Sequence, residues 1–356
     1  MAAHRVGIIG TGDPATRSPK GYAMAYSHAP AYHAQAERCR IVACADLVQE
    51  RADAFAQEFG VEHTYLDYHQ MLARENLDVV SICTWPHLHE QMVVDCSEAG
   101  VHAIHCEKPM ATTWGACKHA VEVCRQKGVQ LTYNHQRRFG RPFRTAKQLL
   151  DEGAIGELEC IEFGMFNLCD YGSHSFDMSA YFADQTPVEW VLAQVAYDRE
   201  SLFFDMPNDT QAVAVWRYAN GVLGRCATGP AGMSLPVHNR LVGTDGVIEV
   251  GRRGEGMPVL RVRRKGGAEW EAMDCGDESC HGPNLHERAI AHVLDCLESG
   301  EKPELCGENA LQSTELIFAC WESSRRRGPV DLPLDVDDNA LVAMIEAGEI
   351  GPRPGA

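Results

Sequence analysis

The stretch Arg5-Val6-Gly7-Ile8-Ile9-Gly10-Thr11-Gly12 decides the fold of the first part of the chain. Its apolar run predicts a buried strand, and the glycines after it predict a tight turn. From this turn to residue 134, short apolar runs alternate with amphipathic stretches. Such alternation predicts an α/β domain, a doubly wound Rossmann sheet of parallel strands with helices on both faces. Strands are expected at residues 5–10, 40–46, 79–84, 102–106 and 129–134, and helices at 48–59, 87–99 and 112–127.

The pattern changes after Gly140, where a helix is expected at 141–152. Turn dipeptides at Asn220-Gly221 and Asp245-Gly246 then separate β-rich segments, which is the signal of antiparallel hairpins. We therefore predict two domains, at residues 1–134 and 135–356, the second an α+β domain with a large, open, mostly antiparallel sheet. Its strands are expected at 157–166, 190–197, 211–217, 222–228, 237–243 and 259–263, and its last helices at 284–299 and 308–327.

Composition restricts the classes of partner. The 356 residues carry 32 Lys and Arg against 50 Asp and Glu, a net charge of −18, which disfavours nucleic acids and anionic membranes. The N-terminus lacks the apolar segment of a signal peptide, and no run approaches the roughly 18 apolar residues of a membrane helix. Fifteen cysteines without repeated CxxC spacing indicate reduced thiols and a cytoplasmic protein. No metal is expected; Cys275, Cys280 and His281 come nearest to a ligand cluster.

Two features after the first strands indicate a dinucleotide site. Gly10-Thr11-Gly12 directly follows the first strand, where backbone amides can approach a pyrophosphate. Asp46 ends the second expected strand, in position to accept hydrogen bonds from the hydroxyls of the adenosine ribose. A carboxylate there repels the 2′-phosphate of NADP, so the pattern favours NAD. The alternative interpretation is that Asp46 caps the helix that follows.

The first turn departs from the usual spacing. Asp46 follows Gly10 by 36 residues, whereas about 20 are usual. Ala15 formally occupies the third position of the GxGxxG/A pattern. The prolines and glycine of residues 13–21 nevertheless indicate an inserted loop, with the first helix beginning only near Gly21. The sequence therefore leaves open whether Ala15 or a residue near Gly21 is the third small residue of the pattern.

A candidate catalytic set consists of one lysine and an Asp–His pair. Lys108, in Glu107-Lys108-Pro109, follows the fifth expected strand, and the carboxyl ends of such strands line the ligand crevice. Asp170 and His174 are four residues apart, which places them on one face of a helical turn. An imidazole titrates near neutrality, and a carboxylate sets its tautomer and basicity. Lys108 or the Asp–His pair alone is a common feature. Their combination in a chain with a dinucleotide-binding domain and a second domain specifically indicates a catalytic site.

With these motifs the chain resembles the Gfo/Idh/MocA oxidoreductases over nearly its whole length. The matching motifs are Gly7-Ile8-Ile9-Gly10-Thr11-Gly12, Glu107-Lys108-Pro109-Met110, Arg137-Arg138-Phe139, Gly153-Ala154-Ile155-Gly156-Glu157, Asp170-x3-His174-x2-Asp177, Gly243-Thr244-Asp245-Gly246, Glu322-Ser323-Ser324 and Val330-Asp331-Leu332-Pro333. By this resemblance Lys108, Asp170 and His174 match the catalytic and substrate-binding residues of the family. The residues that match its nicotinamide ribose pocket are Thr84, His89, Glu107, Lys108 and Asn134, with Trp85 departing from the usual Thr-Pro-Asn.

The resemblance implies an NAD-dependent dehydrogenase that oxidises a secondary alcohol of a sugar, a glycoside or a cyclic polyol such as an inositol. His174, oriented by Asp170, is the first choice for the base that takes the hydroxyl proton, and Lys108 would stabilise the developing negative charge. The sequence leaves open whether His174 or Lys108 is the primary base. Two alternatives remain: an NAD-dependent glycosidase of the same fold with no net redox change, and a non-catalytic NAD sensor. The family also implies a homodimer or homotetramer assembled through the open sheet.

Overall fold

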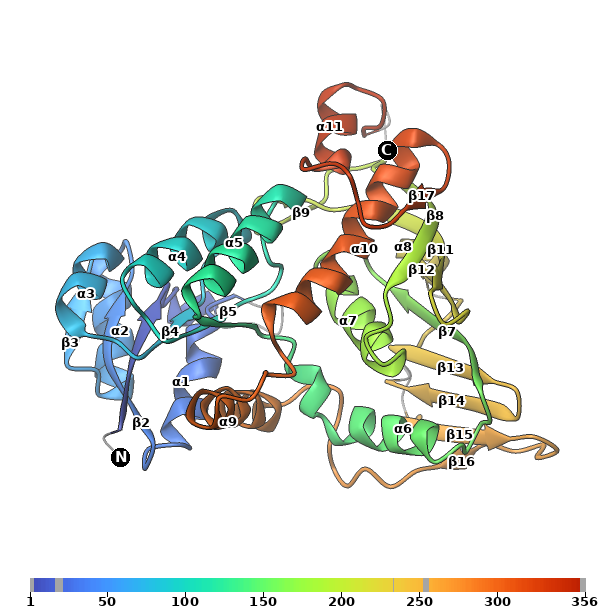
Figure 1. Cartoon of the computed structure of the whole chain (residues 1–356), viewed down its shortest axis with the longest axis horizontal. Helices are drawn as coiled ribbons and strands as arrows, with labels where there is room; N and C mark the ends of the chain where they lie inside the picture. The colour runs from blue at the N-terminus through green and yellow to red at the C-terminus, as the bar shows by residue number, and fades with distance from the viewer. Residues whose placement is uncertain (1–2, 17–21, 233, 252–255, 353–356) are drawn as a thin grey trace. The chain divides into compact units, whose positions relative to one another are not determined.

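The computed structural model describes residues 3–16, 22–232, 234–251 and 256–352 (Figure 1). The chain forms two compact units, each assembled from three segments. The first unit consists of Met1–Thr112, Ala116–Gln136 and Pro283–Leu311, and the second of Thr113–Gly115, Arg137–Gly282 and Gln312–Ala356. No helix in the described part is long and apolar enough to cross a membrane.

The first unit contains a parallel sheet with strand order β3-β2-β1-β4-β5-β6 within the described residues. This is the Rossmann order, which confirms the predicted fold class. The strands are β1 (His4–Ile9), β2 (Cys39–Ala45), β3 (His63–Tyr65), β4 (Val79–Ile82), β5 (Ala103–Cys106) and β6 (Gln130–Tyr133). The helices between them are α1 (Ala25–His33), α2 (Gln49–Phe59), α3 (Tyr68–Glu75), α4 (Pro86–Glu98) and α5 (Trp114–Lys127). The central strands β4 and β5 are buried at every position, as expected when helices cover both faces.

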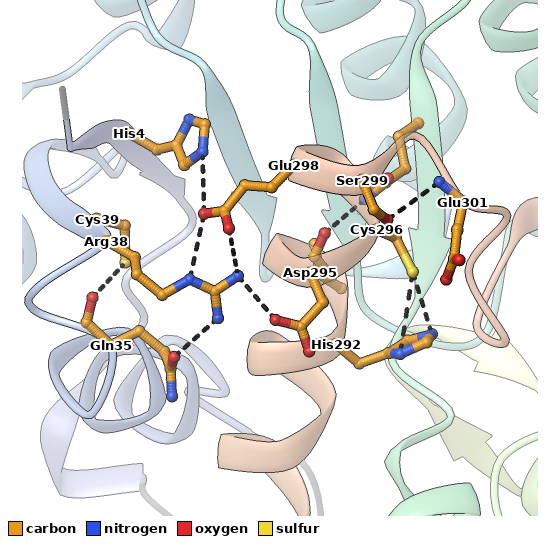
Figure 2. A network of polar contacts seen from close by, with 12 residues as sticks. His4, Gln35, Arg38, Cys39, His292, Asp295, Cys296, Glu298, Ser299 and Glu301 are labelled. Atoms are coloured by element: carbon orange, nitrogen blue, oxygen red, sulfur yellow. Dashed lines mark hydrogen bonds and ion pairs between the residues drawn. The ribbon is translucent and has the colours of Figure 1, made fainter. Parts of the chain in front are cut away.

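Helix α9 (Pro283–Ser299) returns to the first unit although it follows the second sheet in sequence. Its apolar residues Ile290 and Leu294 belong to the same core as Val6 and Phe55. Figure 2 shows the polar rim of this contact, where the Arg38 guanidinium donates to Glu298 at 3.2 and 3.0 Å. The boundary predicted after residue 134 assigned this helix to the second domain. Its apolar stripe instead covers α1, so the first unit is discontinuous in sequence.

The second unit contains a sheet with the order β16-β15-β14-β13-β7-β12-β11-β8-β17 over the described residues. Among the strand pairs formed by described residues of this sheet, only β12–β7 is parallel, which confirms the predicted, mostly antiparallel arrangement. The strands are β7 (Leu158–Met165), β8 (Val188–Ala196), β11 (Gln211–Tyr218), β12 (Leu223–Thr228), β13 (Asn239–Gly243), β14 (Gly246–Val250), β15 (Leu260–Arg264), β16 (Glu271–Ala272) and β17 (Val330–Asp331). The longer helices are α6 (Arg141–Asp151), α7 (Gly172–Phe182), α10 (Gly307–Arg326) and α11 (Ala340–Glu346).

An aromatic cluster attaches α7 to the inner face of this sheet. The ring of Phe176 in α7 lies 4.9 Å from that of Phe163 in β7 and 5.4 Å from that of Trp216 in β11, measured between centroids. Offset and edge-to-face aromatic pairs of this kind stabilise a contact beyond their buried area. Because α7 is buried on nearly every side, packing against its neighbours fixes its position in the core.

Candidate active site

The glycine turn after β1 has the geometry of a dinucleotide-binding loop. Gly10 and Gly12 have positive φ angles of 84° and 72°. A Cβ atom on Gly10 would lie 2.5 Å from Thr84 Cγ2, and one on Gly12 would lie 2.9 Å from Ala23 Cα. Both positions therefore require glycine, for their backbone conformation and for space. The absence of side chains at these two positions lets a phosphate group approach the backbone of the turn closely.

Asp46 lies at the carboxyl end of β2, and its carboxylate faces this turn. Its Oδ2 atom accepts hydrogen bonds from Gly12 N at 2.9 Å and Thr11 Oγ1 at 3.1 Å. Its Oδ1 atom accepts from Val48 N at 3.0 Å, at the start of α2. The two interpretations of Asp46 are therefore compatible, because one oxygen supports the helix start while the other faces the glycine turn.

The insertion in the first turn ends later than the sequence indicates. Residues 14–16 form a short 3-10 turn that includes Ala15, and α1 begins only at Ala25. The segment predicted to start the helix, around Gly21, lies outside the described residues. The residue that packs against Gly12 is Ala23, so Ala15 is not the small residue at the helix start.

His89 is fully buried and connects two loops at the carboxyl ends of β4 and β5. Its Nδ1 lies 2.8 Å from the carbonyl oxygen of Pro109, and its Nε2 lies 3.0 Å from that of Thr84. Burial lowers the pKa of this imidazole, despite the hydrogen bonds that raise it. The side chain of His89 therefore holds the loops of Thr84 and Lys108 in place. Trp85, at the start of α4, is 38% exposed.

Glu107 and Asn134 form part of a buried polar cluster beside Lys108. The Oε1 atom of Glu107 accepts hydrogen bonds from Asn134 Nδ2 at 2.6 Å and His28 Nε2 at 2.8 Å. Its Oε2 atom lies 3.3 Å from the backbone N of Lys108. Burial by itself raises the pKa of Glu107, but His28, Asn134 and Lys108 together lower it to about 2. The carboxylate is therefore ionised at neutral pH. The side chain of Lys108 is half-buried.

Asp170 and His174 lie in the second unit at the start of α7 and are 3% and 5% exposed. Helix α7 begins at Gly172, and Asp170 lies in the turn that leads into it. The side-chain oxygen of Asn167 organises this turn by accepting hydrogen bonds from the backbone N of Asp170 at 2.9 Å and of Tyr171 at 3.1 Å. A Cβ atom on Gly172 would lie 2.6 Å from the carbonyl oxygen of Asn167, which explains the glycine between the pair.

Asp209 holds the backbone of the turn that carries Asp170, and the sequence did not indicate this role. Its carboxylate accepts hydrogen bonds from Leu168 N at 3.1 Å, Thr228 Oγ1 at 3.0 Å and Trp321 Nε1 at 3.4 Å. Asp209 is 1% exposed. Burial raises its pKa to about 6, and these three hydrogen bonds only partly oppose that effect.

This raised pKa predicts a pH-dependent stability. A carboxyl group with a higher pKa in the folded state stabilises the fold when protonated, and that contribution is lost as the pH rises through about 6. We expect the Asp209→Asn variant to be more stable than the wild type by about 1 to 3 kcal/mol at pH 8. Its advantage should vanish below pH 4. Urea unfolding across this range measures the difference, and an unchanged pH dependence in Asp209→Asn would contradict the assignment.

Two neighbouring aromatic side chains, an exposed phenylalanine and a half-buried tyrosine, flank the turn of Asp170. Phe166 at the end of β7 is 51% exposed, and its ring centroid lies 5.2 Å from that of Tyr171. The sequence alone did not single out these residues, because an apolar residue at a strand end usually enters the core.

The predicted site residues form one group in each unit. In the first unit, Gly10, Thr11, Gly12, Asp46 and Thr84 lie at the carboxyl ends of β1, β2 and β4. Glu107, Lys108 and Asn134 follow β5 and β6 at the same edge of the sheet. In open parallel sheets, ligands bind at this edge, next to the point where the strand order reverses. Asp170 and His174 form the group of the second unit.

A Rossmann sheet with a glycine turn and an acidic residue after its second strand defines an NAD-binding oxidoreductase. The chain belongs to the Gfo/Idh/MocA family of such enzymes. A sequence model described as oxidoreductase family, NAD-binding Rossmann fold, matches residues 4–135. The model of the C-terminal alpha/beta domain of that family matches residues 147–332.

Relatives include several named dehydrogenases. The chain is 38% identical to D-apiose dehydrogenase of Paraburkholderia graminis over 331 residues, covering 82% of this chain and 83% of that enzyme. It is 26% identical to myo-inositol 2-dehydrogenase of Thermotoga maritima over 235 residues, covering 62% of this chain and 66% of that enzyme. Among solved structures, levoglucosan dehydrogenase in complex with NADH superimposes with a TM-score of 0.77 at 20% identity, covering 93% of this chain and 99% of that one.

Proposed function

We propose that this enzyme oxidises a secondary alcohol of a sugar or cyclic polyol and transfers the hydride to NAD. The observation that carries the proposal is the turn before α7, whose backbone is held by Asn167 and Asp209 and which carries buried Asp170 four residues before buried His174. Such support is typical of groups whose geometry matters for a reaction. The names of the relatives, which include apiose and inositol dehydrogenases, favour carbohydrates and polyols as the substrate class.

In the proposed mechanism His174 takes the proton of the reacting hydroxyl as general base. Asp170 orients the imidazole and increases its basicity. The Lys108 amine donates a hydrogen bond to the same oxygen and stabilises the negative charge that develops there. NAD, when bound, supplies the hydride acceptor.

A substrate screen tests the proposed function. D-apiose, other aldoses, myo-inositol, scyllo-inositol and levoglucosan are incubated with NAD, and NADH formation is followed by absorbance at about 340 nm. We expect turnover with at least one of these compounds. Cleavage of an aryl glycoside without accumulation of NADH would indicate instead the glycosidase reaction. Tight NAD binding without turnover of any compound would favour a sensor and contradict the proposal.

Asp46 should make the enzyme prefer NAD to NADP. Because a 2′-phosphate would meet the Asp46 carboxylate, we expect NAD to bind at least about tenfold more tightly, equivalent to about 1.4 kcal/mol. Asp46→Ala should narrow this gap, mainly by weakening NAD binding. Asp53→Ala, which removes an exposed carboxylate on α2, is the matched control. Calorimetric titration measures both affinities, and equal or tighter binding of NADP to the wild type would refute the assignment.

We also propose that the outer face of the large sheet forms a homo-oligomer contact. Leu192 and Val213 on neighbouring strands point to this face and are 45% and 55% exposed. Leu223 on β12 adds a third exposed apolar side chain at 41%. Leu192, Val213 and the half-buried Val215 line a depression of about 940 Å³ on this face. Apolar side chains gathered on one sheet face are typical of a protein–protein contact.

The variant Val213→Glu tests this contact. We expect the wild type to be a dimer or tetramer in light scattering at micromolar concentration. Val213→Glu should shift the mass toward the monomer, because a carboxylate without a partner would be buried in the contact. Met257→Glu, at an exposed apolar residue outside this face, serves as control. A monomeric wild type would contradict the proposal.

A further inference from the structure

A buried polar cluster in the first unit has no role in the mechanism described so far. Its centre is His28, in the middle of α1, with 0% exposure. Ser81 of β4, Glu107 after β5 and Asn134 after β6 surround it within hydrogen-bonding distance. His28 and Glu107 are 79 positions apart in sequence, and no motif predicted their contact.

Both ring nitrogens of His28 face oxygen atoms. Nδ1 lies 3.1 Å from Ser81 Oγ, and Nε2 lies 2.8 Å from Glu107 Oε1. The amide nitrogen of Asn134 donates to the same Glu107 oxygen at 2.6 Å and lies 3.2 Å from His286 Nδ1. Because the Ser81 hydroxyl can accept and the Glu107 carboxylate must accept, His28 can donate from both nitrogens, which is what an imidazolium requires. His28 and Glu107 thus form a buried ion pair with matched hydrogen bonds.

The other groups around His28 support this charge assignment. Burial lowers the pKa of His105 to about 3 and that of His286 to about 4, so both are neutral. Burial also lowers the pKa of His28, whereas its hydrogen bond to the ionised Glu107 raises it. Burial raises the pKa of the Cys83 thiol and of the Tyr32 hydroxyl, so neither carries charge near neutrality. Glu107 is therefore the anion that His28 neutralises.

The ion pair of His28 and Glu107 is connected to the proposed catalytic lysine through the Glu107 carboxylate. The second oxygen of Glu107 lies 3.3 Å from the backbone N of Lys108, the next residue in the chain. We propose that His28 is a positioning residue, whose buried imidazolium holds the Glu107 carboxylate and thereby the Lys108 backbone and amine. This inference rests on the proposed role of Lys108. Its physical basis is that an unpaired buried carboxylate is strongly disfavoured, so Glu107 without His28 must take up a proton or move.

The protonation of His28 can be measured in the protein without cofactor. We expect ¹⁵N NMR of histidine-labelled protein to show one ring with both nitrogens protonated from pH 6 to 8.5, a signal that His28→Gln removes. In the Glu107→Gln variant this ring should become neutral, because its counter-ion is gone. A neutral His28 ring in the wild type at pH 7.5 would overturn the proposal.

Kinetics test the positioning role. His28→Gln replaces the ring with an amide that reaches the same Glu107 oxygen but carries no charge. We expect its kcat to fall about ten- to hundredfold, since displacement of a catalytic group by about 1 Å has effects of that size. The acid limb of its pH–rate profile should also move to higher pH, because Glu107 then protonates more easily. If His28→Gln does not fold, the double variant His28→Leu/Glu107→Gln, which leaves no buried charge, should fold and show a similar loss of kcat.

His105→Asn is the matched control, because it also replaces a buried histidine of this cluster. Its Nδ1 lies 2.9 Å from Thr132 Oγ1, and in the described part of the chain His28 and Asn134, not His105, bond the Glu107 carboxylate. We expect reduced stability with an unchanged kcat and pH profile. If folded His28→Gln behaves like this control while Lys108→Met is inactive, only the role of His28 is overturned. If Lys108→Met retains wild-type turnover, the proposed mechanism itself fails.

Discussion

Lys108→Met and His174→Ala are expected to lower kcat by about 10² to 10⁴-fold, the usual contribution of general acid–base groups. Both variants should still bind NAD, with an affinity that falls far less than kcat, because neither residue belongs to the glycine turn or hydrogen-bonds Asp46 among the described residues. Steady-state kinetics with a substrate from the screen, together with calorimetric titration of NAD, separate the two effects.

The double variant distinguishes joint action on one oxygen from two independent roles. If Lys108 and His174 act together, Lys108→Met/His174→Ala should lose less than the product of the single losses. Asp170→Asn retains the size of the side chain but not the charge that orients the imidazole. Its pH–rate profile should therefore shift as well as fall.

Matched controls are available in the same chain. Lys127→Met and His102→Ala alter exposed side chains of the first unit, and both should turn over like the wild type. Each catalytic variant is compared only after thermal unfolding shows that it is folded. Wild-type kcat in folded Lys108→Met would end the proposed mechanism, whereas loss of folding without loss of specific activity would indicate a structural role.

Arg138→Met is expected to lower the free energy of unfolding by about 3 to 5 kcal/mol, the largest stability effect that we predict. Arg138 and Asp177 form a bidentate ion pair at 2.9 and 2.6 Å, with both side chains 2% exposed. The side-chain oxygen of Gln185 accepts two further hydrogen bonds from this guanidinium at 2.9 and 3.0 Å. Removing the arginine leaves the Asp177 carboxylate buried without its counter-ion.

A second variant distinguishes the free energy lost with the ion pair from the cost of leaving the Asp177 carboxylate buried and unpaired. Arg138→Met/Asp177→Leu removes both ions and should be more stable than Arg138→Met alone. Arg125→Met breaks an exposed pair with Glu122, whose side chains are 63% and 45% exposed, and should change stability by less than about 1 kcal/mol. Urea unfolding measures all three. A loss below about 1 kcal/mol in Arg138→Met would contradict the stabilising role of this pair.

The same variant should also affect activity, because Asp177 lies on α7 three residues after His174. The ion pair anchors that helix, so its loss should move the imidazole. We expect a lower kcat in Arg138→Met at temperatures where the protein remains folded, with unchanged NAD affinity. The motif Arg137-Arg138-Phe139 was noted from the sequence only as a family resemblance. The buried ion pair of Arg138 gives it a structural role, which is to anchor α7.

Local patterns were sufficient for the architecture. Apolar runs before Gly10 and Asp46 predicted β1 and β2, since a strand buried on both faces must be apolar throughout. The dipeptide Asn220-Gly221 predicted the hairpin between β11 and β12, and its glycine adopts the positive φ, 89°, that tight hairpin turns favour. The short strand β3 was missed, since its half-polar sequence His63–Tyr65 carries no such pattern.

The sequence by itself therefore determined the two kinds of sheet and the motifs that carry Lys108, Asp170 and His174. Both predictions rest on residues close together in the chain, because the spacing of apolar residues reflects the periods of helices and strands. Only the tertiary structure decided which surfaces meet: that α9 completes the first unit, that His28 neutralises Glu107, and that Asp209 supports the turn of Asp170. An apolar stripe or a buried charge requires a partner, but periodicity does not say which one, because the partner is selected by packing among residues distant in sequence.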